Sequence, residues 1–253
     1  MKEFAEHQTD QGRKRSFVGY WTAGFPNADE SVRIMKACCD AGLNILEIGF
    51  PAQDASMDGE VIKKAQACVD KSLAQNEDYW RTVRQEIAVP IWLMGYKADL
   101  FRDAVYLRLA KERLYDAIVI PDMSQAEREA LSQELQPFGI SVVGFINSQQ
   151  PREETDRALS KETLIYHQLY CGPTGVAHND DSYLSLLHYA QQTSHARLFA
   201  GFGINSPERV EELLRNGFDG VIVGSAIMKL HEQSSEKAYQ FIKDVHRIVR
   251  SVA

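Results

Sequence analysis

The sequence predicts an α/β fold, a single (β/α)8 TIM barrel that spans residues 1–253 as one domain. Short apolar strands alternate with amphipathic helices, eight such units occur, and no Pro-, Gly- and Ser-rich linker separates two halves. At roughly 150 residues per domain, 253 residues allow one domain or two, and eight units of a barrel account for the length as one. An open, doubly wound parallel sheet is the alternative for the same pattern.

The expected strands are short runs rich in β-branched and aromatic residues. They begin near Phe17, Ile45, Ile91, Ala117, Ser141, Leu164, Arg197 and Gly220. The longest interval, 46 residues, separates the second strand start from the third. It holds the loop 50–59 and two helical stretches, 60–72 and 76–86. Because loops after the carboxyl ends of barrel strands carry the chemistry, this loop is a candidate site.

Helix signals lie between the strands. Ser206 is an expected N-cap, Pro207 occupies the first helical position, and Gly217 ends that helix. The stretches 125–138 and 181–193 repeat the design. These signals place a helix after each neighbouring strand, as parallel pairing requires.

The stretch 29–41 also reads as an amphipathic helix, which ends at Gly42. We expect Val32, Met35 and Cys39 to form its buried face.

Composition excludes several classes of protein. Hydrophobic residues make up 44% of the chain, which is enough for a full core. With 28 basic and 35 acidic residues the net charge is -7, so no nucleic-acid or membrane surface is expected. No apolar run approaches the roughly 18 residues of a membrane helix, and the polar N-terminus lacks a secretion signal. We expect a cytoplasmic protein.

Neither cysteines nor histidines are spaced as ligands. Cys38, Cys39, Cys68 and Cys171 fit no zinc or redox pattern, so we expect reduced thiols. The seven histidines include no pair at ligand spacing. A metal site is therefore not expected.

Glu47 interrupts the apolar strand ILEIG, on the face shared by Ile45 and Gly49. A carboxylate buried there must be paired, or its pKa must rise toward neutrality. A raised pKa suits a general acid or base, and a structural ion pair is the alternative. Asp54 and Asp58 follow in the loop, where acids are usually solvated or capping. A second carboxylate facing Glu47 would let the two divide acid and base roles.

Glycines end the last two strands, as Gly201-Phe202-Gly203 and Gly224-Ser225. Barrels that bind phosphorylated substrates hold the phosphate there, on backbone N–H groups near a helix N-terminus. Tight turns without a ligand are the alternative. A third glycine loop, 172–175, follows the sixth strand and carries no phosphate-loop lysine. In that strand, either Tyr166 or His167 could face the interior.

These motifs resemble the α-subunit family of tryptophan synthase. The resemblance covers nearly the whole chain and is most specific in LEIGFPAQDASMDG, IVIPDM, the GPTG loop and GFGINSPERVEELLRNGFDGVIVGSAIMK. It implies a lyase of tryptophan biosynthesis that cleaves indole-3-glycerol phosphate to indole and glyceraldehyde 3-phosphate by acid/base retro-aldol chemistry. It also implies that the reaction needs no cofactor and no metal.

The resemblance assigns residues by position. Glu47 matches the catalytic glutamate, and Asp58 matches the aspartate that holds the indole N–H and stabilises charge on the ring. The remaining matches contact the substrate: Tyr166 beside the glutamate, Thr174 against the aspartate, Tyr20, Met94 and Phe202 around the indole ring, and Gly175, Gly203, Gly224 and Ser225 at the phosphate.

The resemblance also implies a partner, the tryptophan synthase β subunit. The family usually has PFSDPxADGP in the second loop, which faces that subunit, whereas this chain has PAQDASMDGE. Two other functions stay open. One is an aldol or isomerase activity on another phosphorylated substrate, and the other is a weakly active regulatory partner of a β-type subunit.

Overall fold

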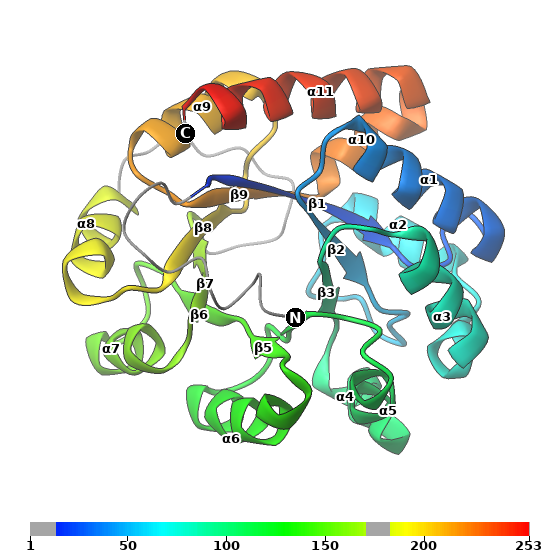
Figure 1. The fold of residues 1–253 in the computed structure, drawn as a ribbon, viewed down its shortest axis with the longest axis horizontal. Coiled ribbons are helices and arrows are strands. Elements are labelled where there is room, and N and C mark those ends of the chain that lie inside the picture. The colour runs from blue at the N-terminus through cyan, green and yellow to red at the C-terminus, as the bar shows by residue number, and fades with distance from the viewer. Residues whose placement is uncertain (1–13, 171–182, 253) are drawn as a thin grey trace.

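The computed structural model describes residues 14–170 and 183–252. One parallel sheet lies at the centre of the molecule, and helices surround it on the outside (Figure 1). The strands are β1 (Ser16–Thr22), β2 (Ile45–Gly49), β3 (Ile91–Met94), β4 (Ala117–Val119), β5 (Ser141–Val142), β6 (Gly144–Ile146), β7 (Leu164–Gln168), β8 (Arg197–Gly201) and β9 (Gly220–Val223).

The sheet closes through a single stretch of chain. Its strand order is β5-β4-β3-β2-β1-β9-β8-β7-β6, so β5 and β6 stand at opposite ends of the ladder. Only Val143 separates these two strands, and its N–H donates to the carbonyl of Ile118 in β4 at 2.9 Å. The eight expected strands are therefore confirmed, the fifth being divided in two, and the (β/α)8 barrel is the fold. The alternative of an open sheet is wrong, because β5 and β6, the two ends of the ladder, are parts of one strand.

The helices lie outside the barrel, as the alternation predicts. They are α1 (Ala28–Ala41), α2 (Glu60–Cys68), α3 (Glu77–Glu86), α4 (Lys97–Leu100), α5 (Val105–Lys111), α6 (Gln125–Leu135), α7 (Arg152–Lys161), α8 (Tyr183–Thr193), α9 (Pro207–Arg215), α10 (Ser225–Gln233) and α11 (Ser235–Ser251). The hydroxyl of Ser206 accepts the N–H of Arg209 at 3.2 Å, which confirms the predicted cap of α9. For α8, residues 181 and 182 of the predicted range lie outside the described residues.

Two helix predictions need correction. In α1 the buried face continues from Met35 to Cys38, three residues on, and Cys39 is only half-buried. The stretch 60–72 is also not one helix. Helix α2 ends at Cys68, and a separate 3₁₀ helix, Lys71–Gln75, begins because the carboxylate of Asp70 caps it.

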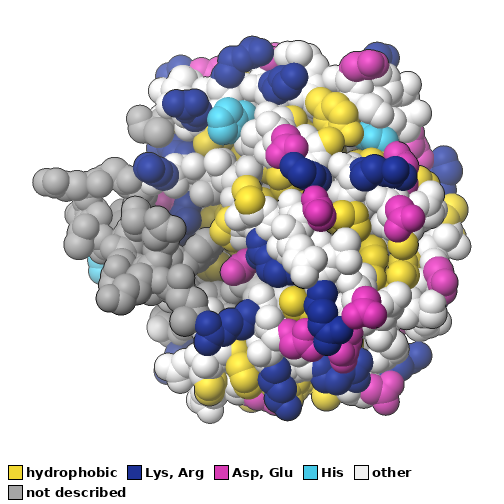
Figure 2. All heavy atoms as spheres, turned by 45° about the vertical axis from the view of Figure 1, so that its right-hand side comes forward, with side chains coloured by type: hydrophobic (Ala, Val, Ile, Leu, Met, Phe, Trp, Pro, Cys, Tyr) yellow, Lys and Arg dark blue, Asp and Glu magenta, His cyan; other side chains and the backbone are white. Residues whose placement is uncertain are grey.

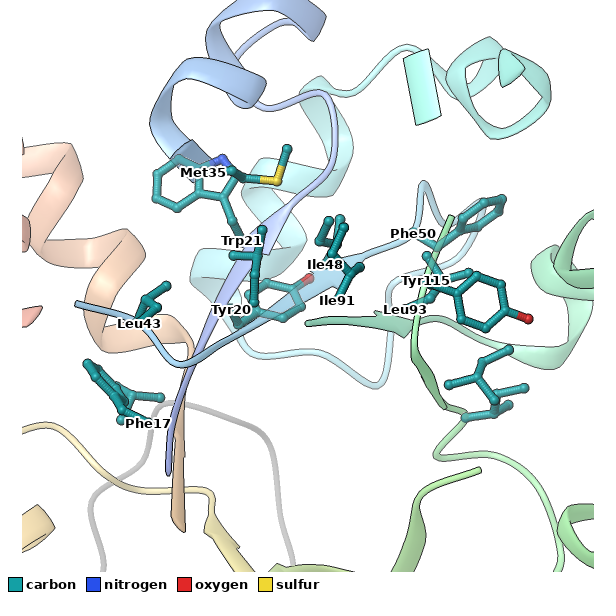
Figure 3. Packing of buried hydrophobic residues seen from close by; sticks show 14 of the residues in the cluster. Phe17, Tyr20, Trp21, Met35, Leu43, Ile48, Phe50, Ile91, Leu93 and Tyr115 are labelled. Atoms are coloured by element: carbon teal, nitrogen blue, oxygen red, sulfur yellow. The ribbon is translucent and has the colours of Figure 1, made fainter. Parts of the chain in front are cut away.

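Strand alternation divides the core into two layers. Inside the barrel, side chains from alternate strand positions fill the interior, among them Val18, Ile45, Trp92, Phe145 and Phe199. A larger layer lies between the strands and the helices, where Trp21, Met35 and Ile48 pack together (Figure 3). The interior is a packed core rather than a channel.

The two ends of the barrel differ. At the amino end, loop side chains accept an N–H from the first or second residue of a neighbouring strand: Asn44 from Phe17 at 2.8 Å, Asp116 from Ile91 at 2.7 Å and Asp219 from Leu198 at 2.8 Å. These bonds cap the sheet at that end. A functional site is therefore expected among the loops at the carboxyl end.

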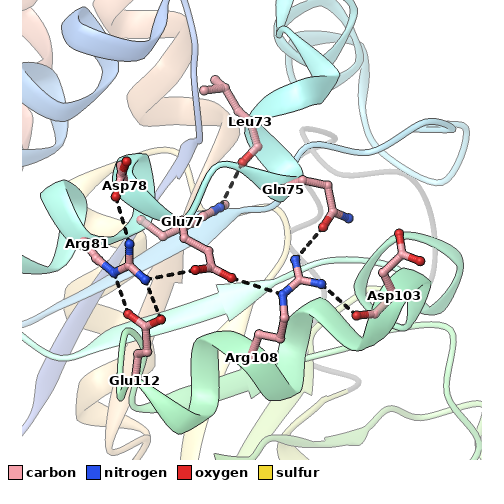
Figure 4. A network of polar contacts seen from close by, with 9 residues as sticks. Leu73, Gln75, Glu77, Asp78, Arg81, Asp103, Arg108 and Glu112 are labelled. Carbon is pink, nitrogen blue, oxygen red and sulfur yellow. Dashed lines mark hydrogen bonds and ion pairs between the residues drawn. The ribbon is translucent and has the colours of Figure 1, made fainter.

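Ion pairs join neighbouring helices on the outer surface. Arg81 on α3 bonds Glu77, Asp78 and Glu112, and Arg108 on α5 bonds Glu77, so one network ties α3 to α5 (Figure 4). Basic and acidic side chains are intermixed over the face in Figure 2. None of the helices within 14–170 and 183–252 is both long enough and apolar enough to span a membrane.

Candidate active site

A pocket opens at the carboxyl end of the barrel. It holds about 620 Å³, a volume that includes its open mouth. Its lining comes from seven strands and from the loops and helix starts that follow strands: Tyr20, Glu47, Asp58, Ile62, Met94, Val119, Pro121, Phe145, Tyr166, Phe202, Gly203, Ile204, Ile222, Gly224 and Ser225. Apolar walls with a few converging polar groups are typical of a small-molecule site.

Glu47 lies at the base of this pocket. It points inward from β2, between Tyr20 of β1 and Trp92 of β3 in the strand register, and is 4% exposed. Burial raises the pKa of Glu47 to about 8, and the charge of Asp58 adds to the rise. Near neutral pH this carboxyl group therefore holds its proton.

Asp58 reaches the same pocket from the loop before α2 and is 5% exposed. Burial raises the pKa of Asp58 to about 6, while a hydrogen bond from the Tyr96 hydroxyl and the charge of Lys63 oppose the rise. At a pH between these two pKa values, Asp58 is therefore mostly ionised while Glu47 is mostly protonated. Asp54 in the same loop is exposed and accepts the N–H of Ser56 at 2.8 Å, which is the ordinary capping role.

Buried polar side chains anchor the loop that carries Asp58. The amide of Gln66 on α2 donates to the carbonyl of Phe50 at 2.9 Å and accepts the N–H of Ala52 at 3.0 Å. Asp99 on α4 accepts the N–H of Gln53 at 3.2 Å. The first residues of the loop are therefore held in place before the chain turns toward Asp58.

Three aromatic rings form one wall. Tyr166 stacks on Phe145 with centroids 5.3 Å apart and meets Phe202 edge to face at 5.7 Å. The buried guanidinium of Arg128 lies 5.3 Å from the centroid of Phe145. A Cβ at Gly201 would stand 2.1 Å from the Tyr166 ring, so glycine there makes room for the wall.

Phe202 itself has a left-handed backbone, with φ of +74°, and Gly203 follows with φ of +73°. A bulky residue rarely adopts this conformation, and such strain collects at binding sites. The turn directs the ring of Phe202 and the backbone of Gly203 into the pocket.

A second wall carries a helix N-terminus. Gly224 is the N-cap residue of α10, Ser225 is its first residue, and no side chain caps this end. Both residues line the pocket together with Gly203. Free N–H groups at the start of a helix form an anion site of the kind that binds phosphate.

The pocket brings together nine of the eleven predicted site residues, with Tyr20, Met94 and Tyr166 in its apolar part. Thr174 and Gly175 lie outside the described residues. The roles of all eleven stay predictions. Within the described ranges, no three His, Cys, Asp or Glu side chains are grouped so that they could hold a metal ion.

Sequence reasoning missed Tyr96 and Phe145. Tyr96 lies two residues beyond β3, at the carboxyl end where the other site residues lie, and this position was the available signal. Phe145 faces inward on β6. The choice between Tyr166 and His167 is settled: Tyr166 faces the pocket, and His167 packs outside the sheet against Tyr183 and Phe218.

Comparison with known proteins gives consistent matches. The sequence profile described as Tryptophan synthase alpha chain matches residues 5–253. The tryptophan synthase alpha chain of Methanoregula boonei is 31% identical, over 93% of this chain and 92% of its own. Mycobacterium tuberculosis tryptophan synthase superposes with a TM-score of 0.81 at 20% identity, covering 94% and 93% of the two chains. A chain of the tryptophan synthase complex from Pyrococcus furiosus superposes with a TM-score of 0.78 at 24% identity, covering 94% of this chain and 99% of its own.

Proposed function

The chain belongs to the tryptophan synthase alpha chain family, lyases that cleave indole-3-glycerol phosphate in tryptophan biosynthesis, and we propose that Glu47 and Asp58 perform this cleavage here. The observation that supports the assignment is a buried pair of carboxyl groups in one pocket, with the pKa of Glu47 near 8 and that of Asp58 near 6. One group can give a proton at the pH where the other carries a charge.

The proton of Glu47 goes to C3 of the indole ring, which leaves a positive charge on the ring. Asp58 accepts a hydrogen bond from the ring N–H and stabilises that charge. The Glu47 carboxylate then takes the proton of the hydroxyl group on the carbon attached to C3. That carbon becomes the aldehyde, the electron pair of the broken C–C bond returns to the ring, and Glu47 is again protonated.

Substrate binding uses the two walls. The indole ring packs among Tyr20, Met94, Tyr166 and Phe202, and Phe145 extends the same apolar surface. The phosphate accepts N–H donors at Gly203, Gly224 and Ser225. Thr174 and Gly175 belong to this proposal through the resemblance alone.

The test is indole release from indole-3-glycerol phosphate by the purified full chain. We expect Glu47→Gln and Asp58→Asn each to lower kcat by roughly 100-fold or more. Asp54→Asn is the matched control, because Asp54 is an exposed carboxylate of the same loop, and it should keep the wild-type rate. If the wild type neither releases indole nor binds the substrate in calorimetry, the proposal is wrong. Turnover of a different phosphorylated compound would then favour the aldol or isomerase alternative.

We propose further that a tryptophan synthase β subunit docks over the mouth of the pocket. Among the described residues, Met57 and Phe101 are the exposed large hydrophobic side chains, 58% and 40% accessible. Met57 lies in the loop after β2, directly before Asp58 of the pocket lining, and Phe101 is the C-cap residue of α4, the helix that follows β3. Exposed apolar side chains beside a site support a docking surface. The proposal includes a cytoplasmic location, which the free thiols of Cys38, Cys39 and Cys68 support.

A further inference from the structure

The hydroxyl group of Tyr20 has no part in the reaction above, which uses only the ring. Tyr20 is 5% exposed and leans from β1 across β2. A Cβ at Gly49 would stand 2.0 Å from this hydroxyl oxygen, so the glycine leaves space for it. A polar group buried at such close quarters needs hydrogen-bond partners.

On one side the hydroxyl reaches helix α10. Its oxygen lies 3.3 Å from Oγ1 of Thr22, and Oγ1 of Thr22 in turn donates to the sulfur of Met228 at 3.8 Å. Since Thr22 has one proton and gives it to the sulfur, Tyr20 is the donor to Thr22. Met228 is the fourth residue of α10, the helix whose first residues line the phosphate end of the pocket.

On the other side the hydroxyl reaches the loop of Asp58. The side chain of Gln66 faces the Tyr20 hydroxyl group and opposes the rise that burial causes in its pKa, and the same amide hydrogen-bonds to Phe50 and Ala52 at the start of the loop. Gln66 is 3% exposed and Thr22 is fully buried. The Tyr20 hydroxyl group therefore stands between this loop and α10, packed against Gly49 at the end of β2 and hydrogen-bonded to Thr22.

We propose that the Tyr20 hydroxyl is a positioning group that holds the Asp58 loop in register with helix α10. A substrate that contacts Asp58 at one end and α10 at the other needs this spacing to be fixed, because a displacement of 1 Å in an active site costs up to about 100-fold in rate. Tyr20 acts through the loop and does not touch the reacting atoms. The inference rests on the proposed function, since the rate of indole release reports on it.

The test uses the full chain and variants that remove one hydroxyl group each. We expect Tyr20→Phe and Thr22→Val each to lower kcat about tenfold while KM changes less than about threefold. Thr22→Ser keeps the hydroxyl and should stay within about twofold of the wild type. If one line of bonds is involved, the double variant Tyr20→Phe/Thr22→Val is no slower than the slower single variant.

A second readout separates positioning from simple packing. A loosened loop exposes Asp58 to water, so its pKa falls toward the ordinary value and the acid limb of kcat/KM moves to lower pH. A Tyr20→Phe variant that folds, keeps kcat within twofold and leaves the acid limb in place would overturn the inference, whatever Thr22→Val does. A double variant whose loss in kcat equals the product of the two single losses would also overturn the inference. Absence of indole release by the wild type would instead refute the proposed function.

Discussion

The carboxyl group of Glu47 is almost fully buried, opposite Tyr20 and Trp92 in the strand register. In an unfolded chain such a group ionises near pH 4.5, whereas in the folded protein its pKa is about 8. Between these two values the unfolded chain gives up a proton that the folded protein keeps. The burial that makes Glu47 an acid therefore lowers the free energy of unfolding as pH rises through this window.

Glu47→Gln should consequently stabilise the protein while it abolishes activity. Glutamine has the same shape as glutamic acid and does not ionise. The gain in the free energy of unfolding is therefore absent below pH 4.5, grows between pH 4.5 and pH 8, and is constant above pH 8. We expect a gain on the order of a few kcal/mol at pH 8, which raises Tm by several degrees. Thermal unfolding of both proteins from pH 4 to 9 measures it, with the exposed Glu60→Gln as control. A pH-independent difference would contradict the burial argument.

The rate should depend on pH through both carboxyl groups. It rises as Asp58 ionises near pH 6 and falls as Glu47 loses its proton near pH 8. The Tyr96 hydroxyl stabilises the ionised form of Asp58, so Tyr96→Phe should raise the pKa of Asp58 and move the acid limb of kcat/KM to higher pH. The basic limb should stay in place. An acid limb that is unmoved or shifted downward would exclude this role for Tyr96.

At the level of elements, the two ends of the strands have different tasks. The amino ends are closed by side chains such as Asp116, which accepts the N–H of Ile91 and pairs with Arg84 at 3.0 Å. The carboxyl ends lead into the loops that line the pocket. Substitutions at the amino end should therefore change stability without changing catalysis.

Asp116→Ala tests this separation. It leaves the N–H of Ile91 without its acceptor, and we expect a loss of about 1–3 kcal/mol in the free energy of unfolding. Asp116→Asn keeps an oxygen at the same place and should lose less. Urea unfolding gives the stability, and kcat should equal the wild-type value in both variants. A large fall in kcat for folded Asp116→Ala would show that the two ends are not independent.

The loop between β2 and α2 shows how an element tolerates a changed sequence. It lacks a serine and two prolines of the usual family pattern, yet Asp58 still reaches the pocket. Gln66 and Asp99 fix its first residues by hydrogen bonds to backbone groups, which do not depend on the loop's own side chains. The position of Asp58 is thus supported by anchors that lie on neighbouring helices.

On the scale of the whole molecule, we propose that substrate and partner bind at the same end of the barrel. Met57 directly precedes Asp58, which lines the pocket, and Phe101 ends the short helix α4 that follows β3. If a β subunit docks there, it covers these side chains and the mouth together. Binding would then exclude water from the pocket, which favours the charge-dependent steps of the reaction.

Phe101→Glu should weaken this association. We expect an apparent affinity for a tryptophan synthase β subunit about tenfold or more below that of the wild type, with an unchanged basal rate, because a charge would be buried in an apolar contact. Arg33→Glu, on the outer face of α1 away from the mouth, is the control. The measurement is indole release during titration with the β subunit. Equal stimulation of Phe101→Glu and wild type would place the partner elsewhere.

The sequence by itself determined the fold class and identified Glu47 and Asp58 as the two candidate carboxyl groups. Strand and helix periods are local, so eight units could be counted and the cap at Ser206 read directly. An acid in an apolar strand has few explanations, so Glu47 stood out. Nine of the predicted site residues meet in one pocket because they lie either on the inward faces of parallel strands or just beyond the carboxyl ends of those strands.

Tertiary structure alone decided what depends on neighbours from distant parts of the chain. The different pKa values of Glu47 and Asp58 come from burial and from Tyr96, which no local pattern connects to them. The division of the fifth strand at Val143 reflects pairing with β4 on one side and β7 on the other. The hydrogen bonds through Tyr20, Thr22 and Met228 join residues up to 208 positions apart along the chain. Such contacts are invisible in sequence because closing the barrel creates them.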